Sequence, residues 1–256
     1  MIVLGLSVAT TSLNESYETD MLNQNLEPRQ VAPSPLNSGC NAGYFGSNIF
    51  NCQPCPSGKY QPQSGQTSCL NAPAGKYVPY SGQTYATSCP AGKYQPQSGQ
   101  TSCLNAPAGK YVSSTGQTYA TSCPAGKYQP QSGQTSCLNA PAGKYVSSTG
   151  QAYATSCPPG KYQPQSGQTS CDDADAGYYV PLPGQSSQTA CGLGTYQYTS
   201  GQSLCDNADA GYYVPLTGQS SQTACLVGTY NPNTSSTNST ACIIASVGYY
   251  VNQTGQ

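Results

Sequence analysis

Residues 89–122 read CPAGKYQPQSGQTSCLNAPAGKYVSSTGQTYATS, and residues 123–156 repeat this stretch with one change, Ala152 in place of Thr118. The sequence therefore repeats with a period of 34. A shorter period of 17 lies within it, because a glycine recurs at every seventeenth position from Gly58 to Gly228, with a tyrosine two residues after each. A second glycine, followed by glutamine, comes seven residues after each of these glycines except the last. The pattern G-x-Y-x4-G-Q-[TS] is typical of a tandem-repeat protein, in which each unit packs on its neighbours.

Each unit has the local pattern of a short β-hairpin. Residues 93–95 and 101–103, for example, are short extended runs on either side of a turn around Gly99. Pro96 keeps the strands short, because proline cannot donate a ladder hydrogen bond. We expect almost no helix after position 40, where no apolar period of 3.6 occurs. The sequence therefore predicts a mostly β or irregular fold of small, disulfide-rich tandem repeats, arranged as an elongated rod of short β-hairpins.

The composition argues against one conventional globular core. Leu, Ile, Val and Phe total 31 of 256 residues, about 12%, well below the ~20% that marks chains able to build such a core. The formal net charge of −1 does not fit the usual disordered class, which combines low hydrophobicity with high net charge. The 14 cysteines in a turn-rich chain indicate that disulfides hold it together.

Several function classes lack the residues that they need. The sequence has no histidine, which removes the Ser-His-Asp triad, the Cys-His dyad and imidazole metal ligands. Its 8 lysines and arginines are too few for a nucleic-acid-binding patch. A zinc site would need two close C-x-x-C pairs, and only Cys52 and Cys55 have that spacing. We expect no enzymatic activity, no cofactor, no metal and no nucleic-acid partner.

The cysteine spacing predicts the disulfide pairing. From Cys55 onward the separations alternate between 14 and 20 and end with 17. Alternate units lack both cysteines, and the replaced positions, such as Ala72 and Ala86, lie 14 apart; in the last two such units Gln188 and Gln222 occupy the second position. Loss in pairs indicates bonding in pairs, since a lone partner would be a reactive thiol. The predicted disulfides are Cys40–Cys52, Cys55–Cys69, Cys89–Cys103, Cys123–Cys137, Cys157–Cys171, Cys191–Cys205 and Cys225–Cys242.

The motif C-P-x-G-K-Y…G-Q-T-x-C, with its C-x-x-C boundary, resembles the ephrin-receptor-like cysteine-rich repeat, a relative of the growth-factor-receptor cysteine-rich modules. The resemblance covers about Cys40 to Gln256. It departs from the family pattern where alternate units lack their cysteine pair. The resemblance implies an elongated, disulfide-stapled spacer in an extracellular or surface-exposed protein, and it supplies no catalytic residues.

The chain divides into four parts on this pattern. Residues 1–39 form an N-terminal flexible arm, with a short helix expected near residues 17–25. Its first nine residues are apolar and end in small residues, which leaves open a weak secretion signal or a flexible or incomplete N-terminus. Residues 40–54 are an incomplete first unit, residues 55–242 are the tandem units, and residues 243–256 are a partial terminal unit. No stretch approaches the ~18–20 apolar residues of a membrane helix.

The polar surface offers three candidate features. Candidate N-glycosylation sequons occur at Asn14, Asn233, Asn238 and Asn252. The charges are segregated: a lysine recurs at every seventeenth position from Lys59 to Lys161, and the acids of the repeats follow later. Solvated surface is the simplest interpretation; weak head-to-tail attraction between chains is the alternative. Three carboxylates, those of Asp172, Asp173 and Asp175, do not supply the oxygen set that calcium prefers.

The tyrosine series has three interpretations. The rings cover the hairpins and disulfides, or they form a binding face, or they form an adhesive surface that is oxidised and cross-linked. The first is favoured, because the tyrosine persists in units that have lost the lysine.

Near-identical repeats favour a role set by length and surface rather than by one unique pocket. The leading hypothesis is an extracellular or cell-surface structural spacer. The alternative is an adhesion or receptor-ectodomain module that binds protein or glycan along the array, and self-association into fibres is a further expectation.

Overall fold

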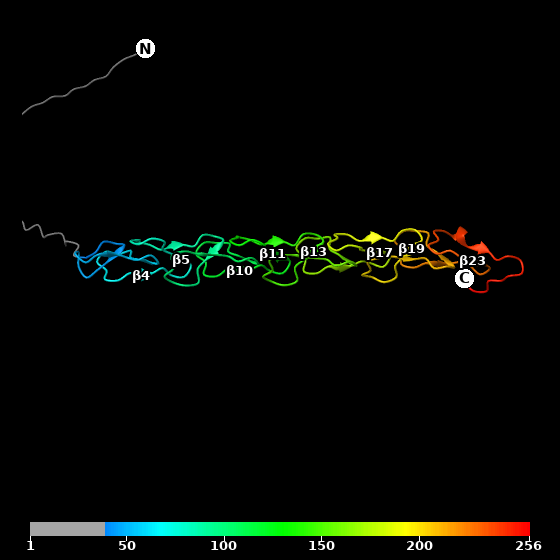
Figure 1. The fold of residues 1–256 in the computed structure, drawn as a ribbon, viewed down its shortest axis with the longest axis horizontal. Helices are drawn as coiled ribbons and strands as arrows, with labels where there is room; N and C mark the ends of the chain where they lie inside the picture. Colours follow the sequence, from blue (N-terminus) through cyan, green and yellow to red (C-terminus); the bar gives the residue numbers. More distant parts are fainter. Residues whose placement is uncertain (1–38) are drawn as a thin grey trace, which may run out of the picture. The chain divides into compact units, whose positions relative to one another are not determined.

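The computed structural model describes residues 39–256. The short helix expected near residues 17–25 and the sequon at Asn14 lie outside these residues. The repeat region by itself is long and narrow, and its colours follow the sequence from one end to the other (Figure 1). It contains no α-helix in residues 39–256, only short strands and one 3₁₀ turn. The mostly β, hairpin-repeat fold predicted from the sequence is confirmed.

The strands form twelve antiparallel two-stranded hairpins, each made of two neighbouring segments of the chain. Every strand is two residues long, and η1 (Ser239–Ala241) is the 3₁₀ turn. The hairpins are β1–β2 (Tyr44–Phe45, Gln53–Pro54), β3–β4 (Lys59–Tyr60, Leu70–Asn71), β5–β6 (Lys76–Tyr77, Thr87–Ser88), β7–β8 (Lys93–Tyr94, Leu104–Asn105), β9–β10 (Lys110–Tyr111, Thr121–Ser122), β11–β12 (Lys127–Tyr128, Leu138–Asn139), β13–β14 (Lys144–Tyr145, Thr155–Ser156), β15–β16 (Lys161–Tyr162, Asp172–Asp173), β17–β18 (Tyr178–Tyr179, Thr189–Ala190), β19–β20 (Thr195–Tyr196, Asp206–Asn207), β21–β22 (Tyr212–Tyr213, Thr223–Ala224) and β23–β24 (Thr229–Tyr230, Ile243–Ile244).

The second strand of each hairpin begins later than the sequence predicted. In the unit that was expected to pair residues 93–95 with 101–103, Lys93 pairs with Asn105 and Tyr94 with Leu104. The reason is that the intervening backbone bonds to other units: the N–H of Gln95 donates to the carbonyl of Gln117 at 3.1 Å. The hairpin therefore encloses a longer loop than its turn residues indicated.

Backbone hydrogen bonds join each unit to its neighbours. The N–H of Gly92 donates to the carbonyl of Val112 at 2.8 Å, and the N–H of Gly99 donates back to the carbonyl of Ala72 at 2.7 Å. The same two bonds recur in unit after unit, so backbone groups that no strand pairs are satisfied across unit boundaries. One late turn keeps the second bond without its glycine, because Ser235 adopts a positive φ of 57° and donates in the same way.

The core is a narrow column of small residues rather than a layer of large apolar side chains. In the units between Cys55 and Val214, three positions spaced three residues apart are buried. We call a unit with a cysteine pair a stapled unit and a unit with alanine and valine in its column an Ala–Val unit. The column residues are Cys89, Gly92 and Gln95 in one stapled unit, and Ala106, Gly109 and Val112 in the Ala–Val unit that follows. The tyrosines of the series lie outside this column and are half-exposed, so they form an outer layer and not the core.

Seven disulfides close the stapled units and the first, incomplete one. They join Cys40–Cys52, Cys55–Cys69, Cys89–Cys103, Cys123–Cys137, Cys157–Cys171, Cys191–Cys205 and Cys225–Cys242. These are the pairs that the spacing argument predicts. The described residues leave no cysteine free. The part of the chain that the structure describes also contains no helix with the length and apolar character of a membrane span.

Candidate functional site on the repeat surface

A buried glutamine braces the loop of each of several stapled units. In the unit of Cys123, the Gln129 Nε2 donates to the carbonyl of Ser136 at 2.8 Å, and its Oε1 accepts from the N–H of Gln131 at 3.1 Å. Gln61, Gln95 and Gln163 make the equivalent pairs of bonds. In the Ala–Val units a buried valine takes this position. From Tyr60 to Tyr213, the residue after each tyrosine of the series is glutamine in a stapled unit and valine in an Ala–Val unit, and this alternation is visible in the sequence; in the last stapled unit Asn231 takes the position of the glutamine.

We expect Gln129→Ala to destabilise its unit by about 2 kcal/mol, because two hydrogen bonds worth about 1 kcal/mol each are lost and their buried partners stay unpaired. Hydrogen exchange of residues 123–139 in the oxidised protein measures this. Gln134→Ala is the matched control, since the Gln134 side chain only donates at 3.4 Å, to Gln131 Oε1 and to a neighbouring carbonyl in its own loop. Equal exchange rates in the two variants would show that the brace contributes nothing.

Two later Ala–Val units carry a polar clamp, with glutamine where the others have alanine and aspartate where they have proline. The N–H of Asp175 donates to Gln188 Oε1 at 2.6 Å, and Gln188 Nε2 donates to Asp175 Oδ2 at 2.6 Å. Asp209 and Gln222 form the same pair at 2.7 Å in both directions. Gln188 and Gln222 occupy the position of the second cysteine, so hydrogen bonds close these hairpins in place of a disulfide. The replacement of the second cysteine by glutamine was visible in the sequence, but the pairing of this glutamine with an aspartate was not.

The aspartates around residue 173 do not converge on one point. Asp173 forms an ion pair with Lys161 at 2.6 Å, while Asp175 is held by its glutamine. Within residues 39–256 no group of three potential ligand side chains is placed to hold a metal ion. These contacts hold the two strands of each hairpin together.

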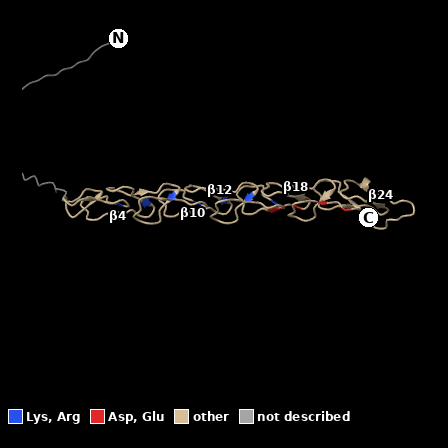
Figure 2. Cartoon of the chain, viewed as in Figure 1, with Lys and Arg blue, Asp and Glu red and all other residues tan. Residues whose placement is uncertain are grey.

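Charge is separated along the repeat region. Residues 40–171 contain seven lysines and no Asp or Glu, whereas residues 172–256 contain five aspartates and no Lys or Arg. Figure 2 shows the blue basic stretch and the red acidic stretch following one another along the array. Of the seven lysines, Lys161 forms the ion pair found among residues 39–256. The net charge of −1 therefore hides a basic stretch and an acidic stretch.

Burial raises the pKa of two tyrosines beside the aspartates. The pKa of Tyr162 is raised above 10.0, first by burial of its hydroxyl and then by the carboxylates of Asp175 and Asp172. Burial likewise raises the pKa of Tyr196, and Asp209 is the largest charged contributor. Both phenols therefore stay neutral to a higher pH than an exposed tyrosine does.

A small surface pocket recurs where an Ala–Val unit meets the next stapled unit. It is lined by the tyrosine of the Ala–Val unit and by the lysine and second cysteine of the stapled unit. The first example is lined by Tyr111, Pro124, Lys127, Ser136 and Cys137 and has a volume of about 180 Å³. The second, one pair of units later, is lined by Tyr145, Pro158, Lys161, Ser170 and Cys171 and has a volume of about 240 Å³. A third, of about 150 Å³, has Tyr213, Thr229 and Cys242 at the equivalent positions, so the lysine is missing there.

A comparison with protein families finds a similarity for part of the array. The family model described as "Tyrosine-protein kinase ephrin type A/B receptor-like" matches residues 43–88, 75–122 and 109–152. The units within residues 43–152 are therefore similar to ephrin-receptor-like cysteine-rich repeats. The three matches overlap, because each of them is longer than the 34-residue period. Together with the disulfides they point to an extracellular, receptor-ectodomain-like module. A search of curated proteins found no match.

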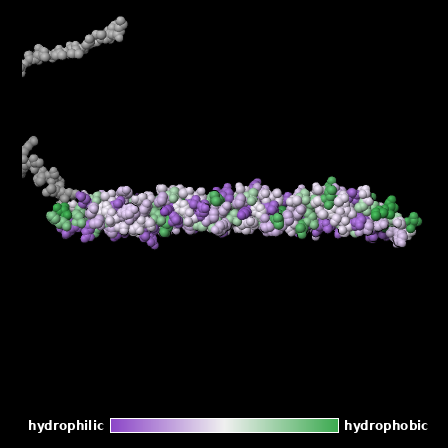
Figure 3. Space-filling view, turned by 45° about the horizontal axis from the view of Figure 1, so that its top comes forward, coloured by the Kyte–Doolittle hydropathy of each residue, from purple (hydrophilic) through white to green (hydrophobic). Residues whose placement is uncertain are grey.

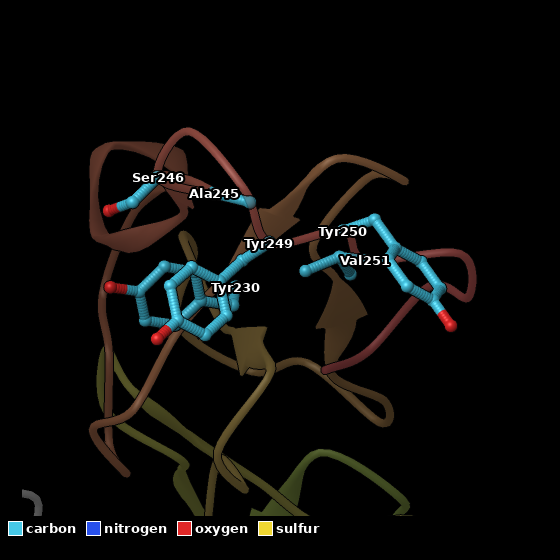
Figure 4. Close-up of a pocket in the computed structure, with 6 residues that line it drawn as sticks. All are labelled: Tyr230, Ala245, Ser246, Tyr249, Tyr250 and Val251. Atoms are coloured by element: carbon cyan, nitrogen blue, oxygen red, sulfur yellow. The ribbon is translucent and has the colours of Figure 1, made fainter.

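An aromatic-lined pocket of the repeat array lies near its last residues. It has a volume of about 340 Å³ and is lined by Tyr230, Ala245, Ser246, Tyr249, Tyr250 and Val251. Figure 4 shows the rings of Tyr230 and Tyr249 together on one side and the ring of Tyr250 pointing away on the other. This set of lining residues occurs once in the described part of the chain, unlike that of the tyrosine–lysine pockets.

Apolar surface on the repeats is divided into small patches. On the face shown in Figure 3 they are separated by polar side chains. The leucines of the strand after each of three disulfides are about half exposed, at 48% for Leu70 and 49% for Leu104 and Leu138. Scattered apolar residues of this kind are ordinary on a protein surface.

The sequons of the described residues lie in exposed positions. Asn233 and Asn238 are exposed in the lengthened loop between Cys225 and Cys242, and Asn252 is exposed near the end of the chain. Asn238 caps η1, accepting a hydrogen bond from the N–H of Thr240 at 3.0 Å. N-glycosylation at these residues stays a prediction.

Proposed function

We propose that the chain is a structural spacer of the cell surface or extracellular matrix, and that it has no catalytic role. The observation that carries this proposal is the unbroken set of backbone hydrogen bonds from unit to unit, repeated with the same partners along the array. Each added unit lengthens such an array by the same amount, so the number of repeats sets the length of the protein. The absence of histidine from the sequence supports the non-catalytic part.

The second candidate function is adhesion, or the binding role of a receptor ectodomain, with protein or glycan partners along the array. The recurring tyrosine–lysine pockets favour it, because a pocket that recurs once per pair of units suits a repetitive partner. Self-association into fibres is a variant of this proposal, supported by the separation of basic and acidic stretches.

Deletion of residues 89–122 tests the spacer. These residues match residues 123–156 apart from position 118, so the shortened chain keeps every type of junction. We expect it to fold with six disulfides and to be shorter by about one sixth, the share of the described array that is removed. Small-angle scattering should show a smaller maximum dimension and an unchanged cross-section.

A length-matched array separates the two candidates. In this variant a copy of residues 140–173 replaces residues 174–207, so length and register stay constant while the surface changes. In cells that lack the native chain, a spacer predicts that the length-matched array restores the phenotype and the shortened array does not. The opposite result, with the shortened array active and the length-matched array inactive, would contradict the spacer and favour binding to particular units.

A further inference from the structure

We propose that the tyrosine–lysine pockets bind single residues of an anionic polysaccharide, a glycan that carries carboxylate or sulfate groups. The inference goes beyond the spacer role and does not depend on it, because the deletion above tests length and the experiment below tests the pockets. Pockets with the complete set of lining residues occur at Lys127 and Lys161. The sequence repeats the same set once more at Lys93, with Tyr77 and Ser102.

The lining of each pocket matches a charged sugar. The ammonium group of Lys127 supplies a positive point charge for a carboxylate or sulfate. The ring of Tyr111 supplies an apolar wall with a polar hydroxyl, and Ser136 adds a further polar group. The volumes of about 180 and 240 Å³ fall below the ~300–1,000 Å³ of pockets for drug-sized ligands. Each pocket therefore takes one small residue, and recurrence along the array suits a polymer that occupies several at once.

The surrounding charge favours a polyanion. Residues 40–171 carry seven lysines without a single carboxylate, so a polymer along this stretch meets a like charge only at its end, where Asp173 pairs with Lys161. Binding releases counterions from the polyanion, and this gain grows with each lysine engaged.

A second copy of the chain fits this stretch less well. It would have to present its five repeat-region aspartates, and four of these already accept hydrogen bonds within their own chain. The four are Asp173, Asp175, Asp206 and Asp209. A nucleic acid fits less well too, because residues 40–256 contain no arginine and the lysines occur only once per unit.

The three pockets differ in how much positive charge they offer to a ligand. Lys127 lies opposite Asn139 across its hairpin and keeps its charge available. Lys161 lies opposite Asp173 and is paired with it at 2.6 Å. The pocket of Thr229 has no lysine at all. Affinity should therefore be highest at the first pocket, lower at the second and lowest at the third.

Binding of the full oxidised chain to immobilised heparin and to polygalacturonate at neutral pH tests the proposal. We expect retention at low salt although the net charge is −1. Lys127→Thr should weaken binding about two- to fivefold, the effect of one exposed ion pair. Asp173→Asn should strengthen it by a similar factor, because it frees Lys161. The matched control is Asp206→Asn, which changes the net charge equally but lies opposite Tyr196, with no lysine in its hairpin.

Four results of the binding assay would overturn the proposal. They are no retention on either glycan, unchanged binding by Lys127→Thr, an equal gain for Asp173→Asn and Asp206→Asn, and equal binding to duplex DNA. The equal gain would mean that long-range charge, not the pocket, controls binding. Light scattering of the free chain at low salt tests whether a second copy of the chain binds this surface instead. A salt-sensitive dimer that excludes heparin would also overturn the proposal, because it would assign the surface to the second copy.

Discussion

Full reduction of the seven disulfides is expected to unfold the whole repeat region, including the Ala–Val units that contain no cysteine. Closing a loop of about 15 residues stabilises a fold by roughly 3 kcal/mol in the chain-entropy model. The Ala–Val units depend on their stapled neighbours for backbone partners. The N–H of Val112 donates to the carbonyl of Gln134 at 3.0 Å, and the N–H of Gly116 donates to the carbonyl of Cys89 at 2.8 Å. When the neighbours unfold, these bonds are lost with them.

Hydrogen exchange after reduction and alkylation measures the effect. The amides of Val112 and Val146 should lose protection together with those of the stapled units. The control is a triple variant, Cys123→Ala, Cys137→Ala and Gln129→Val, which converts one stapled unit into the Ala–Val type. It should stay folded under oxidising conditions and lose about 3 kcal/mol locally. Persistent protection of the Ala–Val units after full reduction would show that their alanine and valine column is sufficient by itself.

The sequence predicted the repeat, the hairpins and the rod because each follows from local periodicity. A glycine two residues before a tyrosine, with a second glycine at the turn, defines the repeating unit from local sequence alone, without reference to contacts with other units. The cysteine pairing could also be inferred, since the two alanines that replace a pair have the same separation of 14 as the bonded cysteines. The start of the second strand could not, because it depends on bonds such as Gln95 N–H to Gln117, which join different units.

The candidate site was predicted less completely than the fold. The lysine and tyrosine series were visible in the sequence, but the pocket between Tyr111 and Lys127 arises only when two units stack. The buried position of Gln129 was missed as well, because glutamine is usually an exposed residue. Its alternation with valine from unit to unit was the available signal. Similarly, the sequence did not indicate that Asp175 pairs with Gln188.

Gly109→Ala is expected to destabilise the array by about 3 kcal/mol or more, well beyond the cost of the same change at Gly133. Both glycines have a positive φ, 79° and 74°. Alanine at either position therefore costs about 1–2 kcal/mol from backbone conformation alone. At Gly109 a Cβ would also overlap the carbonyl oxygen of Gly150, two units further along the chain. That atom is backbone and cannot rotate away, so the units must separate, which adds about 1–3 kcal/mol of overpacking.

Gly133→Ala isolates the conformational part of this cost, because its Cβ would meet nothing closer than the Asn105 side chain at 3.6 Å. Thermal unfolding of the oxidised variants and hydrogen exchange of residues 106–122 compare the two. Exchange should rise sharply in Gly109→Ala, both there and around Gly150, since the clash joins units that are not adjacent in sequence. If both variants lost the same stability, positive φ alone would explain the glycine, and the close approach of the two backbones would not be needed for packing.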